Sequence, residues 1–419
     1  MKKWKFLVLI VLSSMIWSTA VGAAAIFEHY ESLVPYDGKI YALIAKETHT
    51  EVYDFEYFPS EVVEYDKGLN ELRRLKLEDG TASTKNSVIL ALHGDKLYVG
   101  SAGGALGASV WGDLWEVDIR TWKARRILNA SATGAPPYAG ISGLAIANDG
   151  TTFIMTGGYD ALWNYTATLY VSTISEIQAG VAGTGTIISG LGYSWGIAWS
   201  EYDQTLWIMA GSELQARSKT GALIETFTPS LLGDNIYNIT ALEGRTGLIY
   251  TTSDYVSGSI GRIIKTGSRY TVQKDLVTGF GGDTAVFAFK NHNGNARVLL
   301  TEYNYGPNDT VFIYDANDYT KPLENVSNWM SNIHAAATLD NYLYLGSYES
   351  YESGNPDQLP GKIMRVDMLA WDEPKEESPG EDDVPPLKKR SSSGGGCNSL
   401  FDVIAALLLV PAAFIFHKR

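Results

Sequence analysis

Cysteine is almost absent from this sequence, and its absence limits how the fold can be stabilised. Cys397 is the only cysteine among the 419 residues. An internal disulfide is therefore excluded, and packing alone must hold the folded part together. A metal site built from several cysteines is excluded for the same reason.

The sequence also lacks any excess of basic residues. Charged residues make up 19% of the chain, the net charge is −14 and the pI is about 4.9. Nucleic acid binding needs a basic surface to meet the phosphates, so this composition argues against a nucleic acid partner. Part of the acidity is local, because residues 372–383 contain seven acidic residues and one lysine.

Glycine and tyrosine are abundant, with 42 and 25 residues, and hydrophobic residues make up 45% of the chain. Few charges combined with many glycines and tyrosines favour short strands and tight turns over long helices. We therefore expect an all-β fold.

One unit recurs along the chain at intervals of roughly 50 residues. It begins with an apolar strand of small residues, followed by a turn and a second apolar strand; a third strand, a second turn and a fourth strand complete it. The second strand is the clearest part, and its seven copies are marked by Tyr41, Tyr98, Ile154, Trp207, Tyr250, Leu299 and Tyr344.

Seven units of four strands are typical of a β-propeller. Residues 26–371 resemble the seven-bladed β-propeller superfamily in architecture, without the WD40 or kelch signatures. An all-β sandwich is the alternative fold. The seventh unit lacks a fourth strand before Trp371, and we expect residues 24–28 to supply it and close the ring.

The amino-terminal segment, residues 1–25, is typical of a secretory signal peptide. Lys2, Lys3 and Lys5 precede an apolar stretch that is shorter than the ~20 residues of a spanning helix. Small residues follow, and cleavage after Ala23 or Ala25 is expected. The mature chain is then exported, and an uncleaved anchor is the alternative.

The carboxyl-terminal part divides into a linker and an apolar tail. Residues 372–393 combine acidic residues, prolines and serines, a composition typical of a disordered linker. Residues 394–419 end in Lys418 and Arg419, and the apolar stretch 400–416 is predicted to be a short transmembrane helix with its basic end inside.

The tail carries a specific residue order. Gly394, Gly395, Gly396 and Cys397 precede the apolar stretch, which contains Pro411 in its second half. This order resembles the Synerg-CTERM type of sorting signal, a relative of the GlyGly-CTERM signals. The resemblance implies cleavage near the glycines and Cys397 by a rhombosortase-like protease, at least transient contact with the membrane, and transfer to the cell surface. A permanent anchor is the alternative.

No catalytic or metal-binding motif is supported in residues 26–371. The sequence Gly192 to Gly196 fits G-x-S-x-G, but the following residues favour a strand where that motif needs a helix. We interpret it as the turn before the inner strand of the fourth unit. The histidines lie far apart without metal-ligand spacing, so no metal or cofactor is predicted.

Propellers usually bind ligands at one end of the central channel, where the inner strands begin. Aromatic, amide, carboxylate and imidazole groups there can stack on a sugar or bond a peptide, and packing between blades is their alternative role. Counting back from each turn places these residues at that end: Tyr30, Ser142, Trp195, Asn238, Asp283 and His334.

These observations predict an exported bacterial protein anchored at the cell surface. We expect a non-enzymatic binding module for an unknown glycan, peptide or protein of the envelope or its surroundings. The alternatives are an extracellular hydrolase or lyase acting at the channel mouth, and a purely structural envelope protein.

Overall fold

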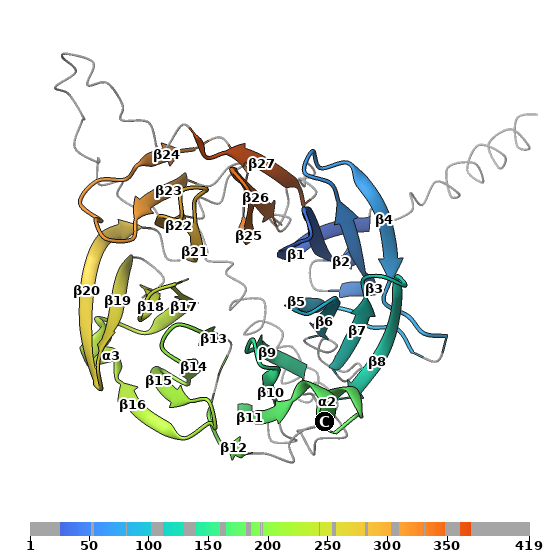
Figure 1. The fold of residues 1–419 in the computed structure, drawn as a ribbon, viewed down its shortest axis with the longest axis horizontal. Helices are drawn as coiled ribbons and strands as arrows, with labels where there is room; N and C mark the ends of the chain where they lie inside the picture. The colour runs from blue at the N-terminus through green and yellow to red at the C-terminus, as the bar shows by residue number, and fades with distance from the viewer. Residues whose placement is uncertain are drawn as a thin grey trace, which may run out of the picture.

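The fold is a ring of seven β-sheets around a central axis, as the computed structural model shows (Figure 1). The structure describes residues 26–51, 54–80, 82–101, 112–129, 140–159, 165–181, 186–192, 194, 196–242, 244–253, 257–280, 284–302, 310–327, 329–330, 332–347 and 361–369. The predicted seven-bladed β-propeller is confirmed. The predicted signal peptide, linker and carboxyl-terminal helix lie outside the described residues.

Each blade is an antiparallel sheet whose strands follow one another outward from the axis. The first four blades contain β1 (Ile26–Tyr36), β2 (Lys39–Glu51), β3 (Asp54–Tyr65), β4 (Glu71–Lys76); β5 (Ser87–His93), β6 (Lys96–Ser101), β7 (Asp113–Asp118), β8 (Lys123–Asn129); β9 (Gly140–Ile146), β10 (Thr151–Tyr159), β11 (Tyr165–Thr173), β12 (Ile187–Ser189); β13 (Ile197–Ser200), β14 (Thr205–Ala210), β15 (Glu213–Ser218) and β16 (Leu223–Phe227).

The last three blades repeat this order. They contain β17 (Ile236–Ala241), β18 (Leu248–Ser253), β19 (Gly258–Thr266), β20 (Arg269–Phe280); β21 (Thr284–Lys290), β22 (Ala296–Glu302), β23 (Thr310–Asp315), β24 (Glu324–Val326); β25 (Ile333–Leu339), β26 (Tyr342–Ser347) and β27 (Ile363–Asp367). Two short helices, α2 (Ile174–Gln178) and α3 (Pro229–Leu232), lie at the rim.

The ring has two ends, which we name by the inner strands. The mouth end is where each inner strand begins, and the turn end is where it turns back into the second strand. In blade one that turn is Asp37–Gly38, with positive φ angles of 49° and 71°. Asp-Gly is favoured at this place because a two-residue hairpin turn needs left-handed backbone at both positions.

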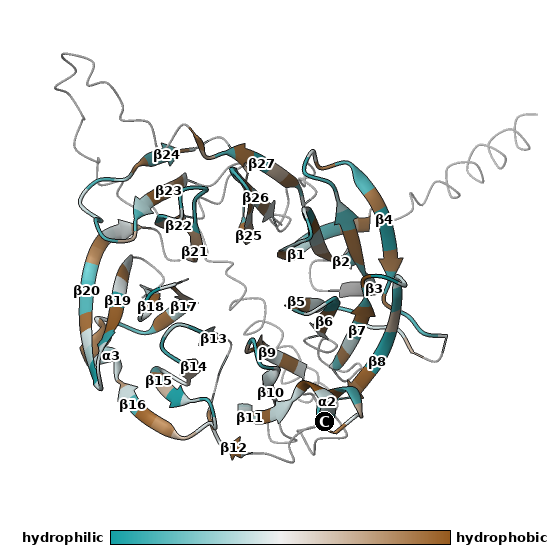
Figure 2. Ribbon diagram, in the orientation of Figure 1, coloured by the Kyte–Doolittle hydropathy of each residue, from teal (hydrophilic) through white to brown (hydrophobic). Residues whose placement is uncertain are grey.

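Apolar side chains of adjacent blades pack face to face and form the core. Leu43 of blade one packs with Val99 and Trp115 of blade two, for example, and all three are fully buried. At the rim the pattern changes: hydrophobic and hydrophilic residues alternate along β20 (Figure 2), and most of its hydrophilic side chains are exposed or half-buried. Burial between the blades therefore holds the ring together.

Small residues on the inner strands allow the blades to approach closely near the axis. A Cβ atom on Gly143 of β9 would lie 2.5 Å from Cγ2 of Ile197 on β13. This contact explains why the repeat unit begins with a strand of small residues.

The predicted closure of the ring is wrong. Ile26 to Glu28 do not join blade seven, because they pair with β2 as the beginning of β1. Blade seven has three strands in the described part of the chain. Blades seven and one meet instead through side chains, with Tyr30 packed beside Ala335 and Tyr344, and through the bond from the Gly361 N–H to the Glu28 carbonyl, 3.0 Å. Ile26 to Glu28 extend β1 toward the mouth end, and this extension lengthens the backbone pairing within blade one.

Candidate functional site at the mouth end

Inner strands of five blades carry one extra residue near the mouth end. In each, the pairing with the second strand skips one position of the inner strand, which defines a β-bulge. A bulge re-aims side chains and is common beside functional sites. The extra residues are Glu31, Val88, Ser142, Tyr237 and His334.

Two of the six ligand residues predicted from the sequence, Ser142 and His334, lie at these bulges. Ser142 is half-buried and its hydroxyl donates to the Met155 carbonyl at 3.3 Å. His334 is also half-buried, at the start of β25. Both therefore lie at the mouth end, where the count from the turns predicted them.

Two other candidates lie one residue away from a bulge. Tyr30 precedes Glu31; its ring is buried, and its hydroxyl lies 3.3 Å from that of Tyr65. Asn238 follows Tyr237 and pairs with Thr251 of β18. For Tyr30 the contacts are those of packing between blades. Trp195 and Asp283 lie outside the described residues.

An ionisable cluster lies beside the blade-one bulge, and we call it the mouth cluster: His29, Glu31, Glu47, Tyr57 and His334. His29 Nε2 lies 3.2 Å from Glu47 Oε1, and both side chains are buried. Of these five residues, only His334 was predicted from the sequence. A His-Tyr-Glu order at the start of β1 was visible, but the partners on β2 and β3 and the bulge were not.

The two carboxyl groups of the mouth cluster have different environments. Burial, and then the neighbouring Glu47, raise the pKa of Glu31 to about 8. Burial also raises the pKa of Tyr57, with further contributions from Glu47 and Glu31. At neutral pH Glu31 therefore carries a proton and can donate it, which is the property expected of a group in acid–base or hydrogen-bond recognition.

His334 is uncharged at neutral pH. Burial, and then the nearby His29, lower its pKa to about 4. A neutral imidazole has one donor and one acceptor nitrogen. The mouth cluster thus combines a protonated carboxyl group, a second carboxyl group beside a histidine, a neutral imidazole and a phenol, a set suited to bonding hydroxyl and amino groups of a ligand.

The G-x-S-x-G segment leads into a strand, as interpreted from the sequence. Ser194 is fully buried; its hydroxyl donates to the Met209 carbonyl and lies 2.9 Å from Met155 Sδ. The inner strand β13 begins three residues later, at Ile197. Ser194 therefore serves as an internal hydrogen-bonding residue of blade four.

Within the described ranges, no group of three or more His, Cys, Asp or Glu residues is arranged to hold a metal ion. Nor does that part of the chain contain a helix with the length and apolarity to cross a membrane.

Comparison with known proteins yields structural neighbours but no family. No family model and no curated protein matches the chain. Hydrazine synthase of Kuenenia stuttgartiensis superposes with a TM-score of 0.54 and 12% identity, over 83% of this chain and 98% of that one. The periplasmic gluconolactonase of Pseudomonas aeruginosa gives 0.50 and 12%, over 82% of this chain and all of that one. At this identity the likeness shows a shared β-propeller fold alone.

Proposed function

We propose that this chain is an exported β-propeller that binds a glycan, peptide or protein of the envelope or its surroundings at the mouth end. The observation that carries the proposal is the mouth cluster beside the bulges of β1 and β25. Ionisable and hydroxyl side chains are concentrated there, whereas the contacts between blades are mostly apolar. Polar groups converging at the end of a propeller channel are suited to ligand recognition.

Glu31 is the residue through which this proposal is best tested. The full-length chain is screened by thermal shift against glycans and peptides, and each ligand found is retested on Glu31→Gln. We expect the variant to lose at least about 1 kcal/mol of binding free energy, the value of a hydrogen bond to a buried polar group. The exposed Glu225 on β16 gives the matched control, Glu225→Gln, which should bind normally. Equal binding by both variants would mean that the ligand site lies outside the mouth cluster. A screen in which no ligand binds would favour a structural envelope protein.

A second candidate function is hydrolysis or elimination at the same place, favoured by the raised pKa of Glu31 beside the carboxyl group of Glu47. In hydrolysis, the Glu31 carboxyl would give its proton to the leaving oxygen as the scissile bond breaks. Glu47 would take a proton from the attacking water. Two neighbouring carboxyl groups, one of them with a raised pKa, are typical of such chemistry.

Chromogenic aryl glycosides and aryl esters test the second candidate directly. Turnover that falls about 100-fold or more in Glu31→Gln, with Glu225→Gln unaffected, would support acid–base chemistry. Binding of a substrate analogue without turnover would leave the binding function and reject the enzymatic one.

The location at the cell surface is proposed from the two ends of the sequence. Residues 1–25 would direct export, and Gly394 to Cys397 would be the processing site for a rhombosortase-like protease, with residues 400–416 held in the membrane until cleavage. The intact mass of the protein isolated from its own cells tests this. A mature chain that starts near residue 26 and ends near Cys397 is expected, and a chain that still ends at Arg419 would contradict the sorting signal.

A further inference from the structure

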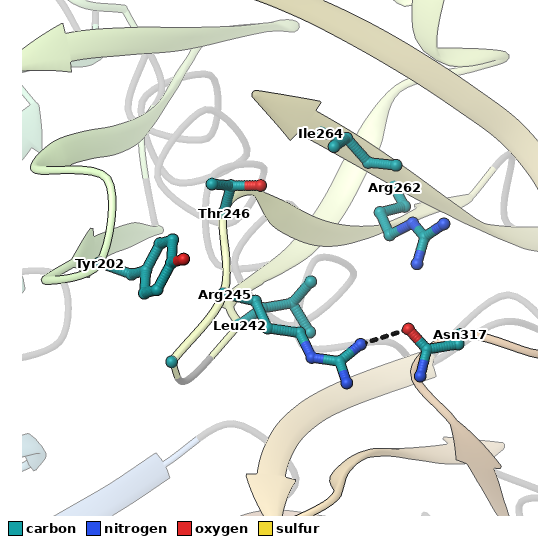
Figure 3. Close-up of a pocket in the computed structure, with 8 residues that line it drawn as sticks. Tyr202, Leu242, Arg245, Thr246, Arg262, Ile264 and Asn317 are labelled. Atoms are coloured by element: carbon teal, nitrogen blue, oxygen red, sulfur yellow. Dashed lines mark hydrogen bonds between the residues drawn. The ribbon is translucent and has the colours of Figure 1, made fainter. Parts of the chain in front are cut away.

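A hollow of about 370 Å³ lies at the turn end, away from the mouth cluster. It is formed where the turns of blades four, five and six meet. Its polar lining includes Arg245, Arg262, Thr246 and Asn317, and its apolar lining includes Leu242 and Ile264. In Figure 3 the guanidinium groups of Arg245 and Arg262 both lie toward Asn317.

Both arginines bond only neutral groups. Arg245 donates to Asn317 Oδ1 (Figure 3). Arg262 donates to Gln273 Oε1 through Nε and Nη2, at 3.1 and 2.8 Å, and to the Ala316 carbonyl through Nη1, at 2.6 Å. In the described part of the chain, neither arginine has a carboxylate within ion-pair distance.

Two carboxyl groups lie on adjoining elements. Asp315 pairs with Arg297 at 2.7 Å. Asp203 Oδ2 accepts the Gly247 N–H at 3.2 Å, and its Oδ1 is buried without a hydrogen bond. A guanidinium has five donors, so each of these two arginines keeps N–H groups for a further acceptor. Among the described residues, the hollow therefore brings together two guanidinium groups that have no ion-pair partner.

In blades one and two, an arginine of the outer strands has a carboxylate as its cross-strand partner. There a glutamate on the third strand pairs in register with an arginine on the fourth: Glu64 with Arg73, and Glu116 with Arg125. The Nε–Oε distances are 2.8 and 3.0 Å. In blade five the arginine is on the third strand instead: Arg262 pairs in register with Gln273 of the fourth strand, so its cross-strand partner is a neutral amide.

We infer that this hollow, which we call the arginine pocket, binds the carboxylate of a small organic acid. Arginine presents parallel N–H donors that match a carboxylate in bidentate geometry. Arg245 and Arg262 supply the charge, and the Thr246 hydroxyl and Asn317 amide supply further hydrogen bonds. Leu242 and Ile264 contact the apolar part of the ligand.

The test uses the full-length chain, with benzoate as the probe and benzamide as its neutral counterpart of the same shape. Ligand-observed NMR measures both, at constant ionic strength. Benzoate is expected to bind at least about tenfold more tightly than benzamide, because only the anion gains charge-assisted hydrogen bonds. Equal binding of the two probes would overturn the inference, as would tighter binding of inorganic phosphate than of benzoate.

Two variants remove the binding in different ways. Arg245→Gln deletes one cation. Gln273→Glu instead places a carboxylate opposite Arg262, so this arginine gains an internal charged partner and keeps its cross-strand contact. Each should weaken benzoate at least about fivefold, and Arg120→Gln, an exposed cation of blade two paired with Asp95, should not. Unchanged affinity in Gln273→Glu, with a melting temperature no lower than that of the natural chain, would reject the arginine pocket.

Discussion

Glu31 occupies a position that no count along the sequence could assign, because a bulge adds it to β1. Side chains alternate between the two faces of a strand, so an offset of one residue exchanges a core position for an exposed one. Counting from the turn therefore selected Tyr30, which packs between blades seven and one, and missed Glu31. The same offset separates Asn238 from Tyr237. At β9 and β25 the count reached the bulge residues Ser142 and His334 directly.

The raised pKa of Glu31 makes the stability of the protein depend on pH. The folded protein holds this proton from the ordinary value of 4.5 up to about 8, whereas the unfolded chain releases it at the lower value. Stability contributed by neutral Glu31 is thus present at low pH and is lost as pH rises toward and above 8. Glu31→Gln should remove this loss, so between pH 5 and pH 8.5 the variant should gain at least about 1 kcal/mol of unfolding free energy relative to the natural chain. Urea denaturation at the two pH values measures it.

His334 makes stability depend on pH in the opposite direction. Its pKa falls from 6.5 to about 4 on folding, so the unfolded chain takes up a proton first as the solution is acidified. Stability is complete above pH 6.5 and is lost as pH falls toward 4. His334→Asn should reduce the loss of stability at acidic pH and leave the loss of stability at alkaline pH unchanged. Denaturation curves measured across the pH range test this. If Glu31→Gln and His334→Asn changed stability in the same pH range, the assignment of the two pKa shifts would be wrong.

The strands were the most predictable elements, because each turn signal fixes a hairpin. The residues that mark the seven second strands in the sequence all lie on those strands, from Tyr41 on β2 to Tyr344 on β26. Outer strands were less predictable. They are short or half-exposed, as β12 and β24 are, and their sequences carry little apolar alternation.

Close packing between inner strands gives a prediction at the scale of the element. Gly143→Ala puts a methyl group into contact with Ile197 and should cost about 1–3 kcal/mol of unfolding free energy. Ile197→Ala removes the opposing group. The double variant should therefore be more stable than the sum of the two single effects predicts, by at least about 0.5 kcal/mol. Strict additivity in denaturant titrations would contradict the contact between β9 and β13.

For the whole molecule, the number of blades was predictable and the closure was not. Seven repeats imply seven blades whatever the details of each unit. Which segment completes the ring depends on whether Ile26 to Glu28 gain more by pairing with β2 or with blade seven. That competition is decided by pairing over the entire length of β1, and the sequence pattern of three residues does not reveal it.

The outer edge of blade seven is expected to be weakly protected from hydrogen exchange. β27 is the last strand of its sheet in the described part of the chain, whereas the third strands of the other six blades are paired on both sides. Amide hydrogens of Ile363–Asp367 should exchange at least about 100-fold faster than those of β15 or β23. Hydrogen exchange followed by mass spectrometry resolves these peptides. Equal protection would mean that a further segment pairs with β27.

The direction of β27 sets the end of the ring from which a tether would start. Asp367 pairs with Tyr342, the first residue of β26, so β27 finishes at the turn end. A propeller held by its carboxyl-terminal tail would therefore be attached at the turn end, through the predicted disordered linker. The arginine pocket would lie at the attached end, and the mouth cluster at the opposite end. One ring could in this way meet two different chemical environments at once.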